Sequence, residues 1–262
     1  MSLSFLENLP NWALFILFPF FSLTVLALLS VLFRLVSKKL GFHDFDSDIL
    51  DTATQNAMSG AYVVLGFVLV MVMSTTNEID ANMAKETSQI ERLDRLLILE
   101  GSAASQTARQ TLHAYTQSII DDDWRKLSLG TRYSETRGFS NKLFDNLKAI
   151  EPKDSLHNAL WIDIIKTNEE LNQYRSLRML SSKSRLPSLF WQVNYLTLLG
   201  VIAIAALRLL NPTGIRVTAL VIQLIMISLL FATVMILDLP YIGQERSSPE
   251  AFEFAVQLMR SR

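Results

Sequence analysis

The 262-residue sequence contains no cysteine, which excludes disulfide bonds, iron–sulfur clusters and zinc sites built from thiolates. It has only three histidines, His43, His113 and His157, which lie too far apart in the sequence to form a metal-binding pair of the usual spacing. The chain also lacks a glycine-rich phosphate loop, the Gly-x-Ser-x-Gly motif of serine hydrolases and the HExxH motif of zinc proteases. We therefore expect neither an enzyme nor a bound cofactor.

The sequence also has no excess of positive charge, because its 24 lysines and arginines are nearly balanced by 25 aspartates and glutamates. Such a balance gives no indication of nucleic-acid binding. By contrast, hydrophobic residues make up half of the chain. This share is high for a soluble domain, and it indicates a protein of the lipid bilayer that also carries a sizeable polar part.

Four apolar segments are long enough to cross the roughly 30 Å hydrocarbon core of a bilayer as helices. They comprise residues 11–33, 57–76, 189–207 and 217–237. No charged residue lies in the middle of any of them, which argues against a proton relay or a carrier that uses buried ionisable groups. The pattern predicts four transmembrane helices, and it favours a passive pore, or no transport at all, over a pump.

The second apolar segment continues without a proline into a charged stretch that keeps apolar residues at helical spacing. This stripe consists of Ile79, Met83, Ile90, Leu93 and Leu97. We therefore expect residues 58–99 to form one helix of roughly 60 Å, half of it in the bilayer and half in water. Asp51 or Thr52 is expected to cap the start of this helix.

The remaining polar segments also show helical periodicity, so the predicted fold class is an all-α membrane protein with an extramembrane helical bundle. The predicted organisation is residues 1–76, the first two transmembrane helices with a short acidic connection; 77–187, the bundle; 188–237, the third and fourth transmembrane helices; and 238–262, a C-terminal tail. Residues 252–259 of the tail are predicted to form a small amphipathic helix that lies against the bundle or against the membrane surface.

Three further predictions concern helix ends in the bundle. Ser140 is expected to cap a short helix, and Asp154 to cap the long helix that follows. Acidic residues 121–123 stand at the C-terminal end of an earlier helix, where the helix dipole disfavours acids. The preferred interpretation is a frayed, solvated end, and the alternative is that arginines of a neighbouring helix bind these acids.

The connection between the first two spans contains Asp44, Asp46 and Asp48, whose alternating spacing is similar to the start of a calcium-binding loop. The segment lacks the glycine of the sixth loop position, and Gln55 stands where the final glutamate is required. We therefore expect a solvated acidic loop and keep a metal site as the less favoured alternative.

Basic residues give conflicting indications of the side on which the bundle lies. Four spans place both termini and the bundle on one side of the membrane. Arg34 after the first span, with Arg208 and Arg216 between the last two, indicates by the positive-inside rule that the short connections are cytoplasmic. Basic residues also crowd the membrane ends of the bundle, for example Arg92, so the orientation stays open.

Two arginines of the predicted long helix, Arg175 and Arg178, lie on the same side within one turn. We expect this pair to bind Glu86 or Asp123 and so to fix the bundle against the membrane. The alternative is that both arginines are ordinary surface charges.

Several short motifs occur in order along the chain. They are Gly60; Glu86; Tyr115, followed by Asp123-Trp124; Arg175-x-x-Arg178; Pro187, followed by Trp191; Asp238-x-Pro240-x-x-Gly243; and Pro249-x-x-Phe252. Through these residues the chain, from about Asn56 to Met259, resembles the bestrophin-like domain family of bacterial membrane proteins. It departs from the family pattern at residues 73–75, where a tryptophan is usual, and at Thr87, where alanine usually follows the glutamate.

The family has no agreed activity, but its name points to the bestrophins, which are pentameric ion channels with four membrane helices and a helical cytoplasmic part. The resemblance therefore implies a homo-oligomer in the bacterial inner membrane, with the second span lining a pore and the bundle in the cytoplasm. This implication concerns the fold, and a fold does not determine function.

The first functional hypothesis is an oligomeric channel for an inorganic ion. Its predicted pore lining consists of residues at steps of three and four along the second span: Gly60, Val64, Phe67, Met71, Thr75 and Glu78. In a ring of subunits, Val64, Phe67 and Met71 would form an apolar collar that gates by dewetting, and a ring of Glu78 carboxylates would favour cations. Because every face of this span is apolar, a stripe that faces lipid or another helix is the alternative.

The second hypothesis is a membrane-anchored interaction protein that conducts no ions. In this case the helical bundle would dock a soluble partner through its polar surface, on which charges of both signs are balanced.

Overall fold

The computed structural model describes residues 10–40, 47–124, 126, 136–181, 186–210, 213–238 and 248–262. The regular elements within these ranges are all helices, which confirms the predicted all-α class. The chain divides into two compact units. Unit 1 consists of residues 1–74, 185–239 and 243–245, and unit 2 of residues 75–184, 240–242 and 246–262.

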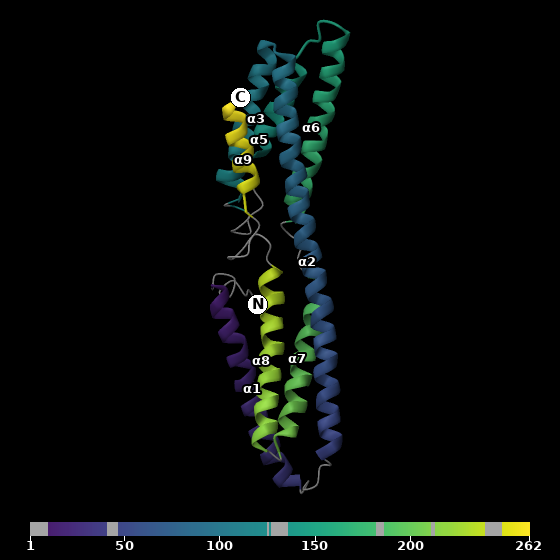
Figure 1. The fold of residues 1–262 in the computed structure, drawn as a ribbon, viewed down its shortest axis with the longest axis vertical. Helices are drawn as coiled ribbons and strands as arrows, with labels where there is room; N and C mark the ends of the chain where they lie inside the picture. The colour runs from purple at the N-terminus through teal and green to yellow at the C-terminus, as the bar shows by residue number, and fades with distance from the viewer. Residues whose placement is uncertain are drawn as a thin grey trace. The chain divides into compact units, whose positions relative to one another are not determined.

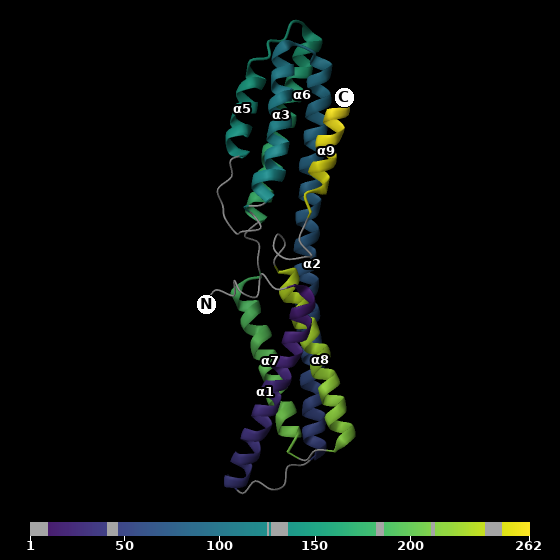
Figure 2. The same ribbon diagram turned by 90° about the vertical axis from the view of Figure 1, so that its left-hand side faces the viewer.

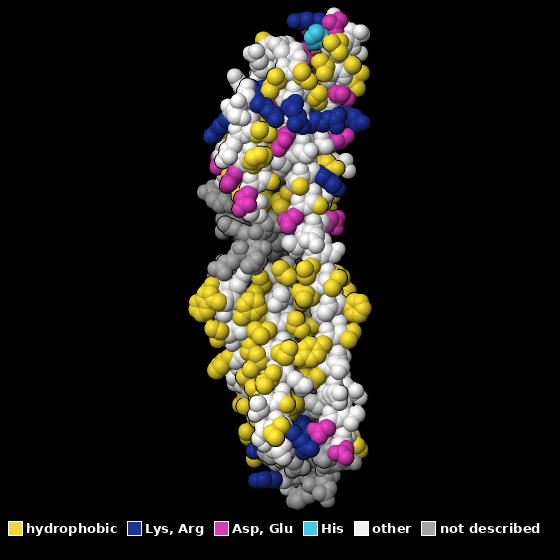
Figure 3. Space-filling model, in the orientation of Figure 1, with side chains coloured by type: hydrophobic (Ala, Val, Ile, Leu, Met, Phe, Trp, Pro, Cys, Tyr) yellow, Lys and Arg dark blue, Asp and Glu magenta, His cyan; other side chains and the backbone are white. Residues whose placement is uncertain are grey.

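Unit 1 contains α1 (Asn11–Leu40), the first part of α2 (Ser47–Glu100), α7 (Ser188–Arg208) and α8 (Gly214–Leu237). These are the four helices in the described residues that are long and apolar enough to cross a membrane. Figures 1 and 2 show α1 and α7 beside α8. Hydrophobic side chains cover most of the face of unit 1 seen in Figure 3, whereas its charged side chains gather at one end.

The core of unit 1 is formed by side chains from all four helices. Leu26 of α1, Leu65 of α2, Ile202 of α7 and Phe231 of α8 belong to the same buried cluster. Aromatic rings pack around Phe231, whose ring centroid lies 5.4 Å from that of Phe18. Because these helices are apolar on every side, their outward surfaces also remain apolar, as is typical of helices in lipid.

The predicted continuous helix over residues 58–99 is confirmed, but its start is not where the sequence indicated. α2 begins at Ser47, so neither Asp51 nor Thr52 caps it. Asp51 lies in the second turn, where its carboxylate binds the Arg208 guanidinium of α7. The role of Asp51 is therefore an ion pair between two helices, and not a helix cap.

Unit 2 contains the second part of α2, α3 (Ala103–Ser118), the π-helical turn η2 (Ile119–Asp123), α5 (Thr136–Lys148), α6 (Ser155–Ser181) and α9 (Glu250–Ser261). Its core is a cluster to which each of these elements contributes, for example Leu93 of α2, Leu112 of α3, Leu147 of α5, Ile164 of α6 and Phe252 of α9. The predicted tail helix thus packs against the bundle, since Phe252, Ala255, Val256 and Met259 are buried in this core.

The predicted cap at Ser140 is wrong, because α5 begins four residues earlier, at Thr136. Ser140 lies inside the helix, and its hydroxyl donates to Asn172 Oδ1 of α6 at 2.7 Å. The predicted cap at Asp154 is confirmed, since its carboxylate accepts the His157 N–H at 2.8 Å. This hydrogen bond lowers the pKa of Asp154.

Unit 1 also buries polar side chains between its helices. The Ser228 hydroxyl of α8 donates to the Ser22 hydroxyl of α1 at 2.9 Å. Asn194 of α7 is only 1% exposed, and neither polar atom of its amide has a hydrogen-bond partner among the described residues. Ser228 thus links two helices. The Asn194 amide, by contrast, is buried without hydrogen bonds to the described residues, which lowers the free energy of unfolding.

We expect Asn194→Leu to stabilise the protein by about 1 kcal/mol, because it removes a buried unpaired amide at similar volume. Ser228→Ala is the matched comparison and should destabilise it by roughly 0.6 kcal/mol, because it removes an interhelical hydrogen bond. Chemical unfolding of the full-length protein in detergent, followed by circular dichroism, measures both changes. A loss of stability in Asn194→Leu would mean that this amide has a partner, such as a bound water molecule.

Candidate functional site

One face of α2 is left uncovered by the other helices of unit 1. The buried side of the helix consists of Met58, Ala61, Leu65, Val68 and Val72. Roughly opposite lie Gly60, Val63, Phe67 and Val70, which are exposed; we call these four residues the open face of α2. Phe67 is the most prominent of them, with 75% of its surface exposed. An apolar face of this kind contacts lipid, another subunit or a shared pore.

The predicted pore lining lies partly on this open face and partly beside it. Gly60, Phe67 and Glu78 are exposed, whereas Val64, Met71 and Thr75 are half-buried. The predicted pore lining therefore runs from the open face onto the flank of the helix, and it does not include Val63 and Val70 of the open face. No signal in the sequence separates these positions, because the whole span is apolar.

The glycines of α2 leave open space within the subunit. A methyl group added at Gly60 or at Gly66 would meet no atom within 4 Å. Glycine in a helix interior costs about 1 kcal/mol relative to alanine, and packing inside the subunit gives no reason for it here. Small residues allow close approach of a neighbouring membrane helix, so these positions suit contact with a helix from another copy.

Ion pairs hold the start of α2 against the other helices of unit 1. The Asp51 carboxylate binds the buried Arg208 guanidinium at the end of α7, and it lies 3.4 Å from Arg216 Nη2 at the start of α8. Arg34 of α1 donates to the Leu209 carbonyl at 3.0 Å, just after α7. These contacts connect all four helices at one end of unit 1.

Asp238 makes a second polar connection, at the end of α8. One carboxylate oxygen accepts the Leu186 N–H at 2.6 Å, and the other accepts the Trp191 indole N–H at 3.1 Å. The aspartate therefore joins the C-terminal end of α8 to the segment that starts α7. Asp238 and Trp191 stood in separate sequence motifs, and the structure brings them together.

A buried charge cluster lies in the core of unit 2. The Arg178 guanidinium of α6 donates from Nε to Glu86 Oε2 of α2 at 2.8 Å and from Nη2 to Asp123 Oδ2 at 3.1 Å. The Tyr115 hydroxyl of α3 donates to Glu86 Oε1 at 3.1 Å. The side chains of Arg178, Glu86 and Asp123 have no exposed surface. We call these four residues the Arg178 cluster.

The π-helical turn η2 explains how Asp123 joins this cluster. After α3 the backbone widens by one turn, in which the Trp124 N–H bonds to the Ile119 carbonyl. A π turn contains an extra residue and therefore shifts the side chains that follow it around the helix axis. The frayed, solvated end expected for residues 121–123 is wrong for Asp123, which is 1% exposed; Asp121 is exposed.

Burial and charge shift the pKa values of the Arg178 cluster. Burial is the main reason that the pKa of Tyr115 lies well above its usual value, and the Glu86 carboxylate raises this pKa further. The pKa of Arg178 is also raised, because the stabilising charges of Glu86 and Asp123 outweigh the opposing effect of burial. The cluster therefore contains a permanent cation and a phenol that stays neutral.

Arg175, the other predicted member of the charge network, lies outside the cluster. It forms no hydrogen bond or ion pair with Glu86 or Asp123, and its Nε has no hydrogen-bond partner among the described residues. The helical rotation between the two arginines directs only Arg178 into the core. The face of Arg178 also lies against the Phe252 ring of α9, 5.7 Å from its centroid.

Of the three aspartates in the less favoured metal site of the acidic connection, the structure describes only one. Asp44 and Asp46 lie outside the described residues, and Asp48 is exposed in the first turn of α2. Within the described part of the chain, no three His, Cys, Asp or Glu side chains gather in a way that could hold a metal ion.

We expect Arg178→Gln to destabilise unit 2 by about 3 kcal/mol or more, because it leaves two carboxylates buried without a cation. Arg175→Gln, one turn earlier on the same helix, is the matched control and should change the free energy of unfolding by less than about 0.5 kcal/mol. Chemical unfolding of the full-length protein in detergent measures both. Equal losses would show that the cluster contributes nothing particular to stability.

The raised pKa of Tyr115 predicts a loss of stability in alkali. Because the folded-state pKa lies above the ordinary value of 10.0, the phenol ionises first in the unfolded chain, and its contribution decreases as the pH rises above that value. Tyr115→Phe should therefore make the unfolding free energy fall less steeply between pH values of about 9.5 and 11. Parallel curves for the wild type and the variant would contradict the assignment.

Comparison with known protein families identifies a domain family to which the chain is similar. The sequence profile of the Bestrophin-like domain matches residues 19–252. A search of curated proteins and a search of solved structures found no significant match. Motif residues that were scattered in the sequence meet at the Arg178 cluster and around Asp238. The profile covers most of the chain, and the protein therefore belongs to the bestrophin-like domain family of membrane proteins.

Proposed function

We propose that the protein is a homo-oligomeric ion channel whose pore is lined by α2. The observation that carries this proposal is the open face of α2, an apolar surface that the subunit does not cover, in a chain of the bestrophin-like family. Channels that gate by dewetting use apolar constrictions of this kind.

A pore of this kind requires several copies of the chain. The interior of unit 1 is filled by side chains such as Leu65, Ile202 and Phe231, so its four helices provide no path of their own. Copies arranged around an axis would place α2 at the centre, with the open face towards the axis and the open space at Gly66 against a neighbouring subunit. The likeness to bestrophins favours five copies.

Phe67 would form the narrowest part of the collar. Its ring projects from the open face, with Val63 one turn before and Val70 one turn after it on the same side. Val64 and Met71 would support the collar from the flank, and Thr75 would follow it. Further along α2, Glu78 is exposed, and a ring of its carboxylates would favour cations over anions.

We place the protein in the bacterial inner membrane with unit 2 in the cytoplasm, as the likeness to bestrophins implies. Positive charge in the short connections favours the opposite orientation by the positive-inside rule. However, Arg208 and Arg216 bind Asp51, and Arg34 binds a carbonyl group. Much of this positive charge therefore has a structural role in holding the helices together.

We expect Phe67→Ala to increase the single-channel conductance in planar bilayers, because a smaller side chain widens an apolar collar. Phe20→Ala is the matched control: Phe20 is 71% exposed on α1, and the same substitution there should leave the conductance unchanged. Reversal potentials under a salt gradient in the same recordings should show cation selectivity.

Two results would contradict this proposal. One is a current that Phe67→Ala and Phe20→Ala change equally, because the open face would then contact lipid only. The other is silence in repeated reconstitutions of a protein whose oligomeric mass has been verified. Silence would favour a membrane-anchored protein whose unit 2, which has a hydrophobic core of its own, docks a soluble partner.

A further inference from the structure

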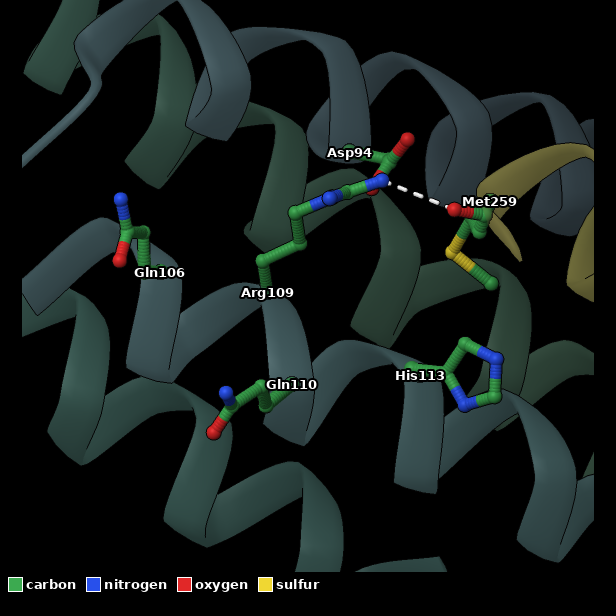
Figure 4. Close-up of a pocket in the computed structure, with 6 residues that line it drawn as sticks. All are labelled: Asp94, Gln106, Arg109, Gln110, His113 and Met259. Carbon is green, nitrogen blue, oxygen red and sulfur yellow. Dashed lines mark hydrogen bonds and ion pairs between the residues drawn. The ribbon is translucent and has the colours of Figure 1, made fainter. Parts of the chain in front are cut away.

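Unit 2 contains a pocket between α3, α9 and the second part of α2. It has a volume of about 400 Å³ and is lined by Asp94, Gln106, Arg109, Gln110, His113 and Met259. This volume lies within the range of small-molecule sites, roughly 300–1,000 Å³. Figure 4 shows Gln106, Arg109, Gln110 and His113 along one helix, with Arg109 extending across the pocket towards Asp94 and Met259.

The four lining residues from α3 occupy one side of that helix. Gln106, Arg109, Gln110 and His113 are spaced by three, one and three residues, which places them on a single helical face. The core residues Ala108, Leu112 and Tyr115 lie on a different face. The four polar side chains therefore take no part in the hydrophobic core of unit 2, and packing of the core does not explain why they are polar.

Two fixed contacts orient the Arg109 guanidinium at the pocket wall. Its Nε donates to Asp94 Oδ1 at 2.6 Å, and its Nη2 donates to the Met259 carbonyl at 2.8 Å. Its Nη1 has no partner among the described residues. The Asp94 carboxylate also lies 3.5 Å from Arg262 Nη1. Because two guanidinium groups neutralise Asp94, this carboxylate is unsuited to hold a free cation.

The other polar groups of the pocket can donate hydrogen bonds. Arg260 Nε lies 3.4 Å from His113 Nε2, which can accept a hydrogen bond from it when the imidazole is neutral and carries its proton on Nδ1. The pKa of His113 is lowered by burial and by the neighbouring charges of Arg260 and Arg109. The Gln106 and Gln110 amides are exposed to the pocket and make no side-chain hydrogen bond within the described residues.

We propose that this pocket binds a small water-soluble organic anion that carries a carboxylate or phosphate group. Arg109 in the pocket and Arg260, which lies outside the lining but contacts the lining residue His113, attract the negative group. The Gln106 and Gln110 amides donate hydrogen bonds to its oxygens, and the Met259 side chain contacts its carbon atoms. Arg109 Nη1 and the two Nη groups of Arg260 remain to donate to the oxygens of either anion, and hydrogen bonds from a guanidinium to an anion are among the stronger ones. The inference is independent of ion conduction, since every group that it uses belongs to unit 2.

Equilibrium dialysis of the full-length protein in detergent tests this proposal. The probes are inorganic phosphate, glycerol 3-phosphate and succinate, each at an ionic strength kept constant with chloride. We expect saturable binding of at least one probe at one site per chain. A preference for glycerol 3-phosphate or for succinate would identify the phosphate or the carboxylate as the recognised group.

Two variants locate the site, and one serves as a control. Arg260→Gln and Gln110→Leu should each weaken binding about tenfold, the effect of losing one good hydrogen bond to a charged group. Arg137→Gln removes the same charge from an exposed position of α5 that does not line the pocket, and it should leave binding unchanged. No saturable binding of any probe, or an equal loss in Arg137→Gln, would overturn the proposal.

Discussion

The buried guanidinium of Arg178 joins the helices of unit 2. Taking the charge of Arg178 out of water costs several kcal/mol unless carboxylates accept its hydrogen bonds. Those carboxylates come from α2 and from the π turn after α3, while the Phe252 ring of α9 covers the guanidinium face. Elements far apart in the chain therefore meet at this arginine, and the hydrophobic core packs around it.

Unit 1 depends on polar contacts in a different way. Hydrophobic burial cannot select one arrangement of helices in lipid, because lipid tails are as apolar as leucine side chains. The specific contacts lie mainly at the helix ends, where Asp51 binds Arg208 and Asp238 binds the Trp191 indole. Between the ends, the Ser22–Ser228 hydrogen bond connects α1 with α8. These few contacts hold α2 with one defined face left open.

The two units carry separate functional proposals. The channel proposal rests on what unit 1 leaves uncovered, an apolar helix face with open space at Gly60. The binding proposal rests on what unit 2 encloses, a polar pocket where Arg109 is oriented by Asp94. α9 contributes Met259 to that pocket, and it follows the last membrane helix in the chain. An anion that binds there would contact α9, the helix that follows α8 in the chain.

The helical class, the four segments long and apolar enough to span a membrane and the unbroken course of α2 could all be predicted from the sequence, because periodicity and length are local properties. The sequence also contained the residues of the Arg178 cluster and of the Asp238 contacts, scattered as short motifs. Three features depend on contacts between distant segments and could not be predicted: Arg178 and not Arg175 enters the core, a π turn directs Asp123 inwards, and Asp51 binds Arg208. The tertiary structure also decided which side of α2 stays open, since on a span that is apolar all round only packing against α1, α7 and α8 distinguishes one face from another.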